Sequence, residues 1–251
     1  MMPLIISSFL IPTKKRISMI VYEGKSMLDG KPIVMIALVD STNRKTGNLI
    51  QTYIMRSDIH PQDAINSGED ESICGSCIHR KQVGDNGRTC YVFPPSFAGI
   101  YKKYKSGGYE HINSRSINKF KNRLIRLGSY GDPLAVPTQV WSKLLSLSSG
   151  FTGYTHQWSD ESLDTNFWKK VTQASVETIE EKNEANRLGF KTYRVGQKGE
   201  KPMRDEMLCP ASDEAGKALQ CDQCLRCNGQ TKNIFIPVHG ANHILNKFKQ
   251  V

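Results

Sequence analysis

The sequence lacks the short motifs that mark several large enzyme classes. It contains no P-loop, no G-x-G-x-x-G, no G-x-S-x-G and no H-E-x-x-H. Their absence argues against the common nucleotide-hydrolysing, dinucleotide-binding, serine-hydrolase and metalloprotease sites. The chain also has no apolar run long enough to cross a membrane, so we expect no membrane partner.

The N-terminal segment lacks the charge order of a signal peptide. Met1 to Ile11 is apolar, and the basic residues Lys14, Lys15 and Arg16 follow this run instead of preceding it. A signal peptide has the reverse order and a small-residue cleavage site, so we expect a buried N-terminal strand here. The expected localisation is therefore cytoplasmic, in a reducing compartment where disulfide frameworks are rare.

The overall composition is typical of a globular protein. The 251 residues are 38% hydrophobic and 23% charged, and the net charge is +10. Positive charge is concentrated between residues 102 and 126, where Glu110 is the single acid. Such a stretch could hold nucleic acid or a phosphate-bearing ligand, or could be the solvated face of a helix. Its basic residues are Lys102, Lys103, Lys105, Arg115, Lys119, Lys121, Arg123 and Arg126.

Short apolar segments alternate with helix-like segments along most of the chain. Strands are predicted at residues 16–22, 31–39, 49–55, 124–127, 150–155, 173–176, 191–195 and 233–238. Helices are predicted to begin near Pro61 and to cover residues 137–146, 160–170, 178–188 and 241–249. The polar segment 40–47 joins the second and third strands as a hairpin.

Strands and helices in alternation predict parallel βα units. We therefore expect an α/β fold with a βα-barrel-like core, partial or complete, or an open doubly wound sheet. Residues 1–60 would form an N-terminal β-hairpin region packed on a βα core of residues 61–251, together one continuous domain. In both architectures the functional residues lie just past the C-terminal ends of the strands.

The C-terminal cysteines have the spacing of metal ligands. Cys209 precedes a proline, and Cys221, Cys224 and Cys227 form a C-x2-C-x2-C run. Clustered cysteines in a reducing compartment more often bind metal than pair with one another, and seven cysteines cannot all pair. The run suits the spread corners of a 4Fe–4S cube better than the shell of one zinc ion, although zinc remains an alternative.

The N-terminal group consists of Cys74 and Cys77, with His79 close behind, and Cys90 further on. These residues could close a Cys3His zinc site. Alternatively, the three cysteines could hold a 4Fe–4S cube with one iron open to a small molecule. The sequence leaves both possibilities open.

Polar residues follow several predicted strands, at the edge where a βα sheet places its working groups. We take Asp132, His156, Gln157 and Glu177 as candidate catalytic residues. Glu177 could also bind an amine or a ribose hydroxyl of a cofactor, and Asp132 could line the same site. Arg194 is a further cofactor-binding candidate, and Glu177 is its expected partner if it is buried. The alternatives are turn chemistry for Asp132 and helix-capping charge for Glu177.

Several segments together resemble an uncharacterised family found mostly in bacteriophages and prophages. The resemblance covers roughly residues 30 to 240 and implies no known activity. In a phage-encoded chain the expected compartment would be the cytoplasm of the host cell. The segments are Ile73-Cys-Gly-Ser-Cys-Ile-His-Arg80, Cys90-Tyr-Val92, Arg126-Leu-Gly-Ser-Tyr-Gly-Asp-Pro133, Thr152-Gly-Tyr-Thr-His-Gln-Trp158 and Cys209-Pro-Ala-Ser212.

A looser similarity is to radical S-adenosylmethionine proteins. Those are βα barrels in which three cysteines hold a 4Fe–4S cube, S-adenosylmethionine binds the open iron, and a second cluster often lies nearer the C-terminus. The similarity implies that Gly131 and Asp132 occupy the place of the loop that holds the methionine amino group. The usual spacing is C-x3-C-x2-C, whereas here twelve residues separate Cys77 from Cys90.

Two functions from different classes follow from these patterns. The first is an iron–sulfur protein with one or two 4Fe–4S clusters, which as an enzyme would use S-adenosylmethionine. The second is a protein without catalysis, in which zinc stabilises the fold and the basic stretch 102–126 binds nucleic acid.

Overall fold

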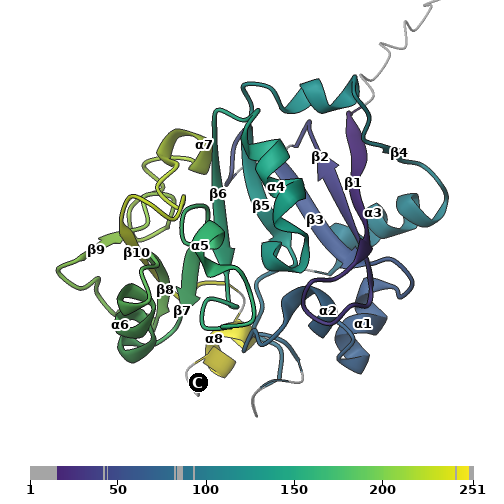
Figure 1. Cartoon of the computed structure of the whole chain (residues 1–251). Helices are drawn as coiled ribbons and strands as arrows, with labels where there is room; N and C mark the ends of the chain where they lie inside the picture. Colours follow the sequence, from purple (N-terminus) through teal and green to yellow (C-terminus); the bar gives the residue numbers. More distant parts are fainter. Residues whose placement is uncertain are drawn as a thin grey trace, which may run out of the picture.

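The computed structural model describes residues 16–41, 43, 45–81, 83, 87–92, 94–240 and 242–248. The strand predicted at residues 1–11 lies outside them. The described residues form a 10-stranded sheet in the order β4-β1-β2-β3-β5-β6-β7-β8-β10-β9, with helices packed against it (Figure 1). The α/β class predicted from the sequence is confirmed.

The strands are β1 (Ser18–Lys25), β2 (Pro32–Leu38), β3 (Ile50–Arg56), β4 (Glu110–His111), β5 (Leu124–Tyr130), β6 (Gly150–Thr155), β7 (Gln173–Val176), β8 (Thr192–Gly196), β9 (Glu206–Leu208) and β10 (Asn233–Pro237). The α-helices are α1 (Pro61–Ser67), α2 (Glu71–Cys74), α3 (Pro95–Lys105), α4 (Thr138–Leu145), α5 (Thr165–Trp168), α6 (Ile179–Arg187), α7 (Cys221–Cys224) and α8 (Asn242–Phe248). Two 3-10 helices cover Ser116–Phe120 and Pro133–Ala135.

The sheet joins an antiparallel half to a parallel half. β1, β2 and β3 pair antiparallel, which confirms the predicted hairpin between β2 and β3. β3 then pairs parallel with β5, and β6, β7, β8 and β10 continue the parallel half. The N-terminal strands thus extend the same sheet. Among the described residues, the edge strands β4 and β9 are not hydrogen-bonded to each other, so the sheet is open.

The two faces of the parallel half differ because side chains alternate along a strand. On β5, Ile125 and Leu127 belong to the hydrophobic core together with Trp141 of α4, and α4 lies in front of β5 and β6 in Figure 1. Arg126 and Tyr130 point to the other face, where they line a cavity. One face of the sheet is therefore core, and the other forms the wall of a site.

Local signals explain where the elements begin and end. Helix α6 begins at a capping box in which Thr178 and Glu181 satisfy each other's backbone N–H groups, as the sequence predicts for residues 178–188. Helix α5 covers only Thr165–Trp168 instead of residues 160–170. Helix α3 was not predicted from the sequence, because two consecutive prolines usually interrupt a helix. Here Pro94 precedes the helix and Pro95 is its first residue, a position where proline is tolerated. No helix among the described residues is both long and apolar enough to cross a membrane.

Candidate metal-binding cavity

All seven cysteines line one cavity of about 510 Å³, which lies on the face of the sheet opposite to α4. The cavity wall consists of alternate residues of the central strands, such as Gly128 and Tyr130 on β5, Thr152 and Tyr154 on β6, and Tyr193 on β8. No disulfide links the cysteines, which are all free thiols. The cysteines that lie far apart in the sequence are therefore gathered around a single space.

The N-terminal cysteine group is held by Gln157, at the C-terminal end of β6. The Gln157 amide donates to the carbonyl of Cys74 at 2.9 Å and accepts from the backbone N–H of Ser76 at 3.1 Å. Gly75 lies between them with φ 52°, and a Cβ on it would be 2.2 Å from Oε1 of Gln157. Only glycine fits this position, and Gln157, predicted as a catalytic candidate, acts by positioning the cysteine loop.

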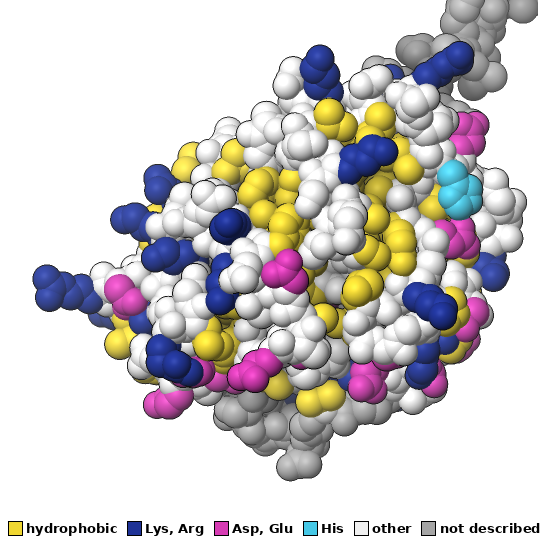
Figure 2. Space-filling model, in the orientation of Figure 1, with side chains coloured by type: hydrophobic (Ala, Val, Ile, Leu, Met, Phe, Trp, Pro, Cys, Tyr) yellow, Lys and Arg dark blue, Asp and Glu magenta, His cyan; other side chains and the backbone are white. Residues whose placement is uncertain are grey.

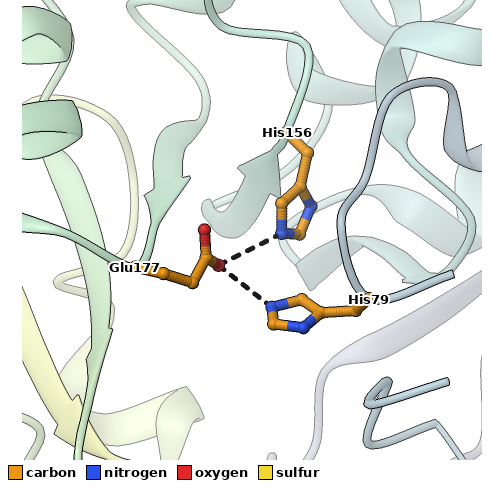
Figure 3. Close-up of side chains that lie close together, drawn as sticks. All are labelled: His79, His156 and Glu177. Atoms are coloured by element: carbon orange, nitrogen blue, oxygen red, sulfur yellow. Dashed lines mark hydrogen bonds and ion pairs between the residues drawn. The ribbon is translucent and has the colours of Figure 1, made fainter. Parts of the chain in front are cut away.

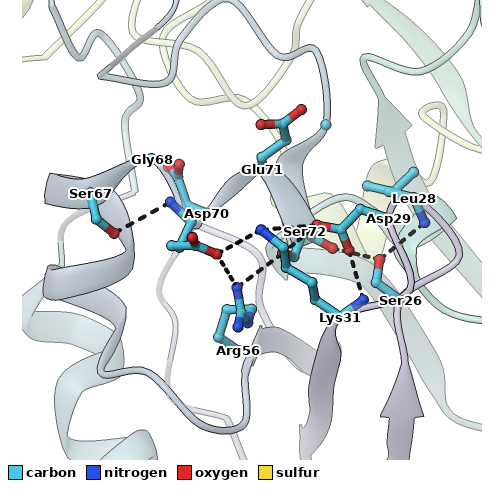
Figure 4. Close-up of polar contacts among 12 residues, drawn as sticks. Ser26, Leu28, Asp29, Lys31, Arg56, Ser67, Gly68, Asp70, Glu71 and Ser72 are labelled. Carbon is cyan, nitrogen blue, oxygen red and sulfur yellow. Dashed lines mark hydrogen bonds and ion pairs between the residues drawn. The ribbon is translucent and has the colours of Figure 1, made fainter.

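A second polar network fixes the base of the same loop. Ser72, two residues before Cys74, donates its hydroxyl to Asp29 at 2.7 Å and accepts from Arg56 at 3.2 Å (Figure 4). The Ser72 carbonyl accepts from the hydroxyl of Ser26 at 2.6 Å. Ser72 is fully buried, so these bonds attach the cysteine loop to the β1–β2 turn and to the end of β3.

Two histidines and a carboxylate meet beside this group. Oε1 of Glu177, just past β7, lies 3.0 Å from Nε2 of His79 and 3.7 Å from Nε2 of His156 (Figure 3). The other ring nitrogen of His79 bonds the Thr89 hydroxyl at 2.8 Å. The ligand atoms of the three residues lie within 4.8 Å of one another, which is close enough to hold one metal ion.

The charges in this trio are strongly coupled. Burial alone would raise the pKa of Glu177, but the neighbouring His156 and His79 rings lower it to about 2. Burial alone would lower the pKa of His156, yet Cys77 and Glu177 raise it well above its ordinary value. The trio therefore places an ionised carboxylate between two histidine rings, with His156 also close to Cys77.

Asp132 is hydrogen-bonded to the backbone of His156, a member of the trio. Its carboxylate accepts from the backbone N–H of His156 at 2.9 Å, from the Thr155 hydroxyl at 3.0 Å and from the N–H of Leu134 at 3.0 Å. Burial is the largest influence on Asp132 and raises its pKa. With these three bonds the carboxylate orients His156. Neighbouring Gly131 and Asp132 both line the cavity.

The C-terminal cysteine group lies at the opposite end of the cavity. The N–H of Gly153 on β6 donates to the carbonyl of Cys227 at 2.9 Å, and the N–H of Cys221 donates to the carbonyl of Lys45 at 3.3 Å. Figure 1 shows α7, which carries Cys221 and Cys224, beside the starting end of β6, whereas α8 lies where β6 ends. The N-terminal group is held at that second end by Gln157.

The sulfur atoms of each group interact mainly within that group. The thiol of Cys74 is influenced by Cys77 and Cys90, and the thiol of Cys227 by Cys209 and Cys221. Burial is the largest influence on both thiols and raises their pKa. A buried thiolate needs a positive charge beside it, such as a metal ion, to form at neutral pH.

The sulfur atoms are less closely grouped than the ligand atoms of the trio. Among the described residues, which include all seven cysteines, the His79, His156 and Glu177 set is the one group of three ligand atoms within 4.8 Å. Four thiolates on one zinc ion lie about 3.8 Å apart, given a Zn–S bond of about 2.3 Å. The corners of an iron–sulfur cube are spread further.

The predicted pairing of Arg194 with Glu177 is wrong. Arg194 donates to Glu206 at 2.7 and 2.8 Å and also pairs with Glu200. The reason is strand alternation: Tyr193 lines the cavity, so Arg194 points to the other face of β8. Arg194 is fully buried and ties β8 to β9, and its guanidinium is occupied by these two carboxylates.

The basic stretch 102–126 divides among several environments. Arg123 donates to the carbonyl of Val39 at 3.0 Å, and Arg126 points into the cavity. The exposed members are Lys102, Lys105, Arg115, Lys119 and Lys121. On the face shown in Figure 2, Lys and Arg side chains lie around the edges, with Asp and Glu side chains among them along the lower edge.

Sequence reasoning missed Arg126, Thr152 and Tyr193 as residues of the site. Arg126 was counted with the basic stretch, and Tyr193 was assigned no role. The signal that could have found them is the alternation along each strand, because Arg126 and Tyr130 share one face of β5. Comparison of the chain with protein-family models, with curated proteins and with solved structures finds no match.

Proposed function

We propose that this chain is an iron–sulfur protein in which two cysteine-bound clusters face one substrate cavity. Cys74, Cys77 and Cys90 would hold a 4Fe–4S cube with one iron not bound by the protein. Cys209, Cys221, Cys224 and Cys227 would hold a second cube. The observation that carries the proposal is that all seven cysteines line one cavity while no three sulfurs lie within the reach of a single ion.

The surroundings of the N-terminal group support an enzyme. A cube with an open iron binds a small molecule at that iron, and the similarity to radical S-adenosylmethionine proteins suggests S-adenosylmethionine as cosubstrate. The site lies at the C-terminal ends of parallel strands, where βα folds place their reactive groups. The face of the sheet that carries Gly128, Thr152 and Tyr154 would form the wall of the active site.

The residues of this chain would have defined tasks in that site. Gln157 positions the cysteine loop, and Asp132 orients His156 through its backbone N–H. Glu177 stays ionised between the two histidines and keeps a proton available on His156. In the absence of a metal in this trio, His156 is the group best placed to deliver a proton to the cavity.

The first experiment is metal analysis with an absorption spectrum on protein purified without oxygen. We expect several irons per chain and a broad band near ~400 nm, as for thiolate-bound clusters. The variants C77S/C90S and C221S/C224S should each remove about half of the iron, since each disrupts one cube. Two zinc ions per chain and no colour would overturn the proposal.

A second candidate function is a zinc-stabilised protein that binds nucleic acid. The observation in its favour is the exposed basic set of residues 102–121. It predicts two zinc ions and an affinity for nucleic acid that falls steeply with salt. An affinity for nucleic acid that does not change with ionic strength would exclude this second function.

A further inference from the structure

The cavity contains an arginine without a carboxylate partner. Arg126 of β5 lines the cavity on the side of the C-terminal cysteine group, near Cys221. No carboxylate of the described residues forms an ion pair with its guanidinium, which lies 4.9 Å from the ring of Tyr154. Other arginines buried in this protein are paired: Arg80 with Asp70, and Arg194 with Glu206.

An unpaired cation in a cavity wall is costly unless something compensates it. A guanidinium is not deprotonated in proteins, so Arg126 stays charged in the cavity wall. A guanidinium presents a planar fork of donors that matches carboxylate and phosphate oxygens. The cavity thus contains a preformed donor for an oxyanion.

A second group points to the same ligand. Thr152 is the register partner of Arg126 on the neighbouring parallel strand β6, so both side chains emerge on the same face. Thr152 is 2% exposed and lines the cavity, and its buried hydroxyl has no hydrogen-bond partner. A buried hydroxyl without a partner is uncommon, and an oxyanion on Arg126 would accept its hydrogen bond.

The walls beside these donors are aromatic and aliphatic. The rings of Tyr154 and Tyr193 lie 4.5 Å apart, inclined at 55°. Ile234 and Ile236 of β10 line the same cavity. Such walls suit the planar or apolar body of a small molecule whose charged head reaches Arg126.

We infer that the substrate is a small molecule with a carboxylate or phosphate head, bound by Arg126 and Thr152, and an apolar body against Tyr154 and Tyr193. The inference rests on the proposed function in one respect, because it takes this molecule as the substrate of the cavity that holds the clusters. Its binding test does not depend on iron content, so the two proposals can fail separately.

Benzoate, phenyl phosphate and the neutral benzamide are suitable probes for calorimetric titration of the full chain. We expect either anion to bind at least about tenfold more tightly than benzamide, since a charge-assisted hydrogen bond contributes that much. Tighter binding of benzoate identifies a carboxylate head, and tighter binding of phenyl phosphate identifies a phosphate head. Equal binding of anions and benzamide, or no binding of the anions, overturns the inference.

Variants then locate the bound anion. R126M should weaken anion binding about tenfold or more, and R126K should fall between R126M and the unchanged protein, because lysine keeps the charge but loses the fork. T152V should weaken it a few-fold, about the value of one neutral hydrogen bond. The control K119M removes the same charge from an exposed position and should leave the affinity unchanged.

Arg126 could instead balance the charge of the thiolates at Cys221 and its neighbours. R126M would then alter the visible spectrum or reduction potential of the iron-loaded protein while anion affinity stayed the same. That result overturns the inference. Circular dichroism of R126M and R126K checks that both variants are folded.

Discussion

The two cysteine groups lie at opposite ends of one cavity and differ in what surrounds them. The N-terminal group is next to His79, His156 and Glu177, and both histidines form ion pairs with Glu177. The C-terminal group is next to Arg126 and two tyrosines, and α7 is the only helix in the described chain between β9 and β10. In the proposed function the two groups would therefore have different tasks: proton transfer beside the first group, and stability with charge balance at the second.

The largest expected effect is a difference in unfolding free energy between variants of the two cysteine groups. Residues 209–232 contain only the four-residue helix α7 as regular structure, so the proposed metal would supply much of their order. We expect C221S/C224S to lower the free energy of unfolding by more than about 5 kcal/mol, and C77S/C90S by clearly less. Denaturant unfolding of the metal-loaded protein measures both.

Hydrogen exchange provides the local control for this comparison. Loss of the C-terminal site should increase exchange within residues 209–232 and leave β2 and β3 protected. Equal losses of stability from both double variants would show that the two groups do not differ in this way.

The next effect compares two arginines of the parallel half of the sheet, Arg126 on β5 and Arg194 on β8. R194M would leave Glu206, which is fully buried, without its partner, so we expect a loss of about 3–5 kcal/mol. R126M leaves no carboxylate unpaired and should change the unfolding free energy by less than about 1 kcal/mol. Urea titration of both variants tests this, and similar losses would indicate that Arg126 is also structural.

The third effect concerns pH at the N-terminal end. The pKa of Glu177 falls from 4.5 to about 2 on folding, so its contribution is present above pH 4.5 and is lost as the pH falls toward 2. E177Q should therefore cost up to about 3 kcal/mol near pH 6. The difference from the unchanged protein should vanish between pH 4.5 and 2.

Denaturant unfolding at a series of pH values measures that difference. C224S, in the other group, is the matched control, because its cost should not follow this pH window. A cost of E177Q that is constant with pH would contradict the charged trio.

The smallest effect tests the positioning of the N-terminal loop. G75A places a methyl group 2.2 Å from Oε1 of Gln157 at a positive φ, so we expect a strain of about 1–3 kcal/mol. Displacement of Gln157 should release iron from the first group and leave the second group loaded. Iron content and thermal unfolding measure the two consequences.

Gly99 provides the control for this substitution. It lies in helix α3 with open space around it, so G99A should be neutral or stabilise the protein by about 0.5–1 kcal/mol. Full iron content in G75A would show that the loop does not need Gln157.

Much of the fold could be predicted, because it depends on local patterns. The strand at residues 150–155 and the helix at 178–188 are predicted from the sequence, and the structure confirms both. The rule that βα sites lie past strand ends selects Asp132, His156 and Glu177, and these residues do lie together. Helix α3 and the short strands β4 and β9 were missed, since they have weak or no periodicity.

The sequence by itself determined the α/β class, the strand ends that carry polar residues and the spacing of the cysteines, because each depends on neighbours along the chain. Only the tertiary structure decided that both cysteine groups share one cavity and that Glu177 meets His79, 98 residues away, instead of Arg194. It also decided that Arg126 faces the cavity and that Arg194 is buried on the other face of the sheet. The physical reason is strand pairing: it fixes which face each side chain occupies and which distant loops meet at the sheet edge, and neither is encoded locally.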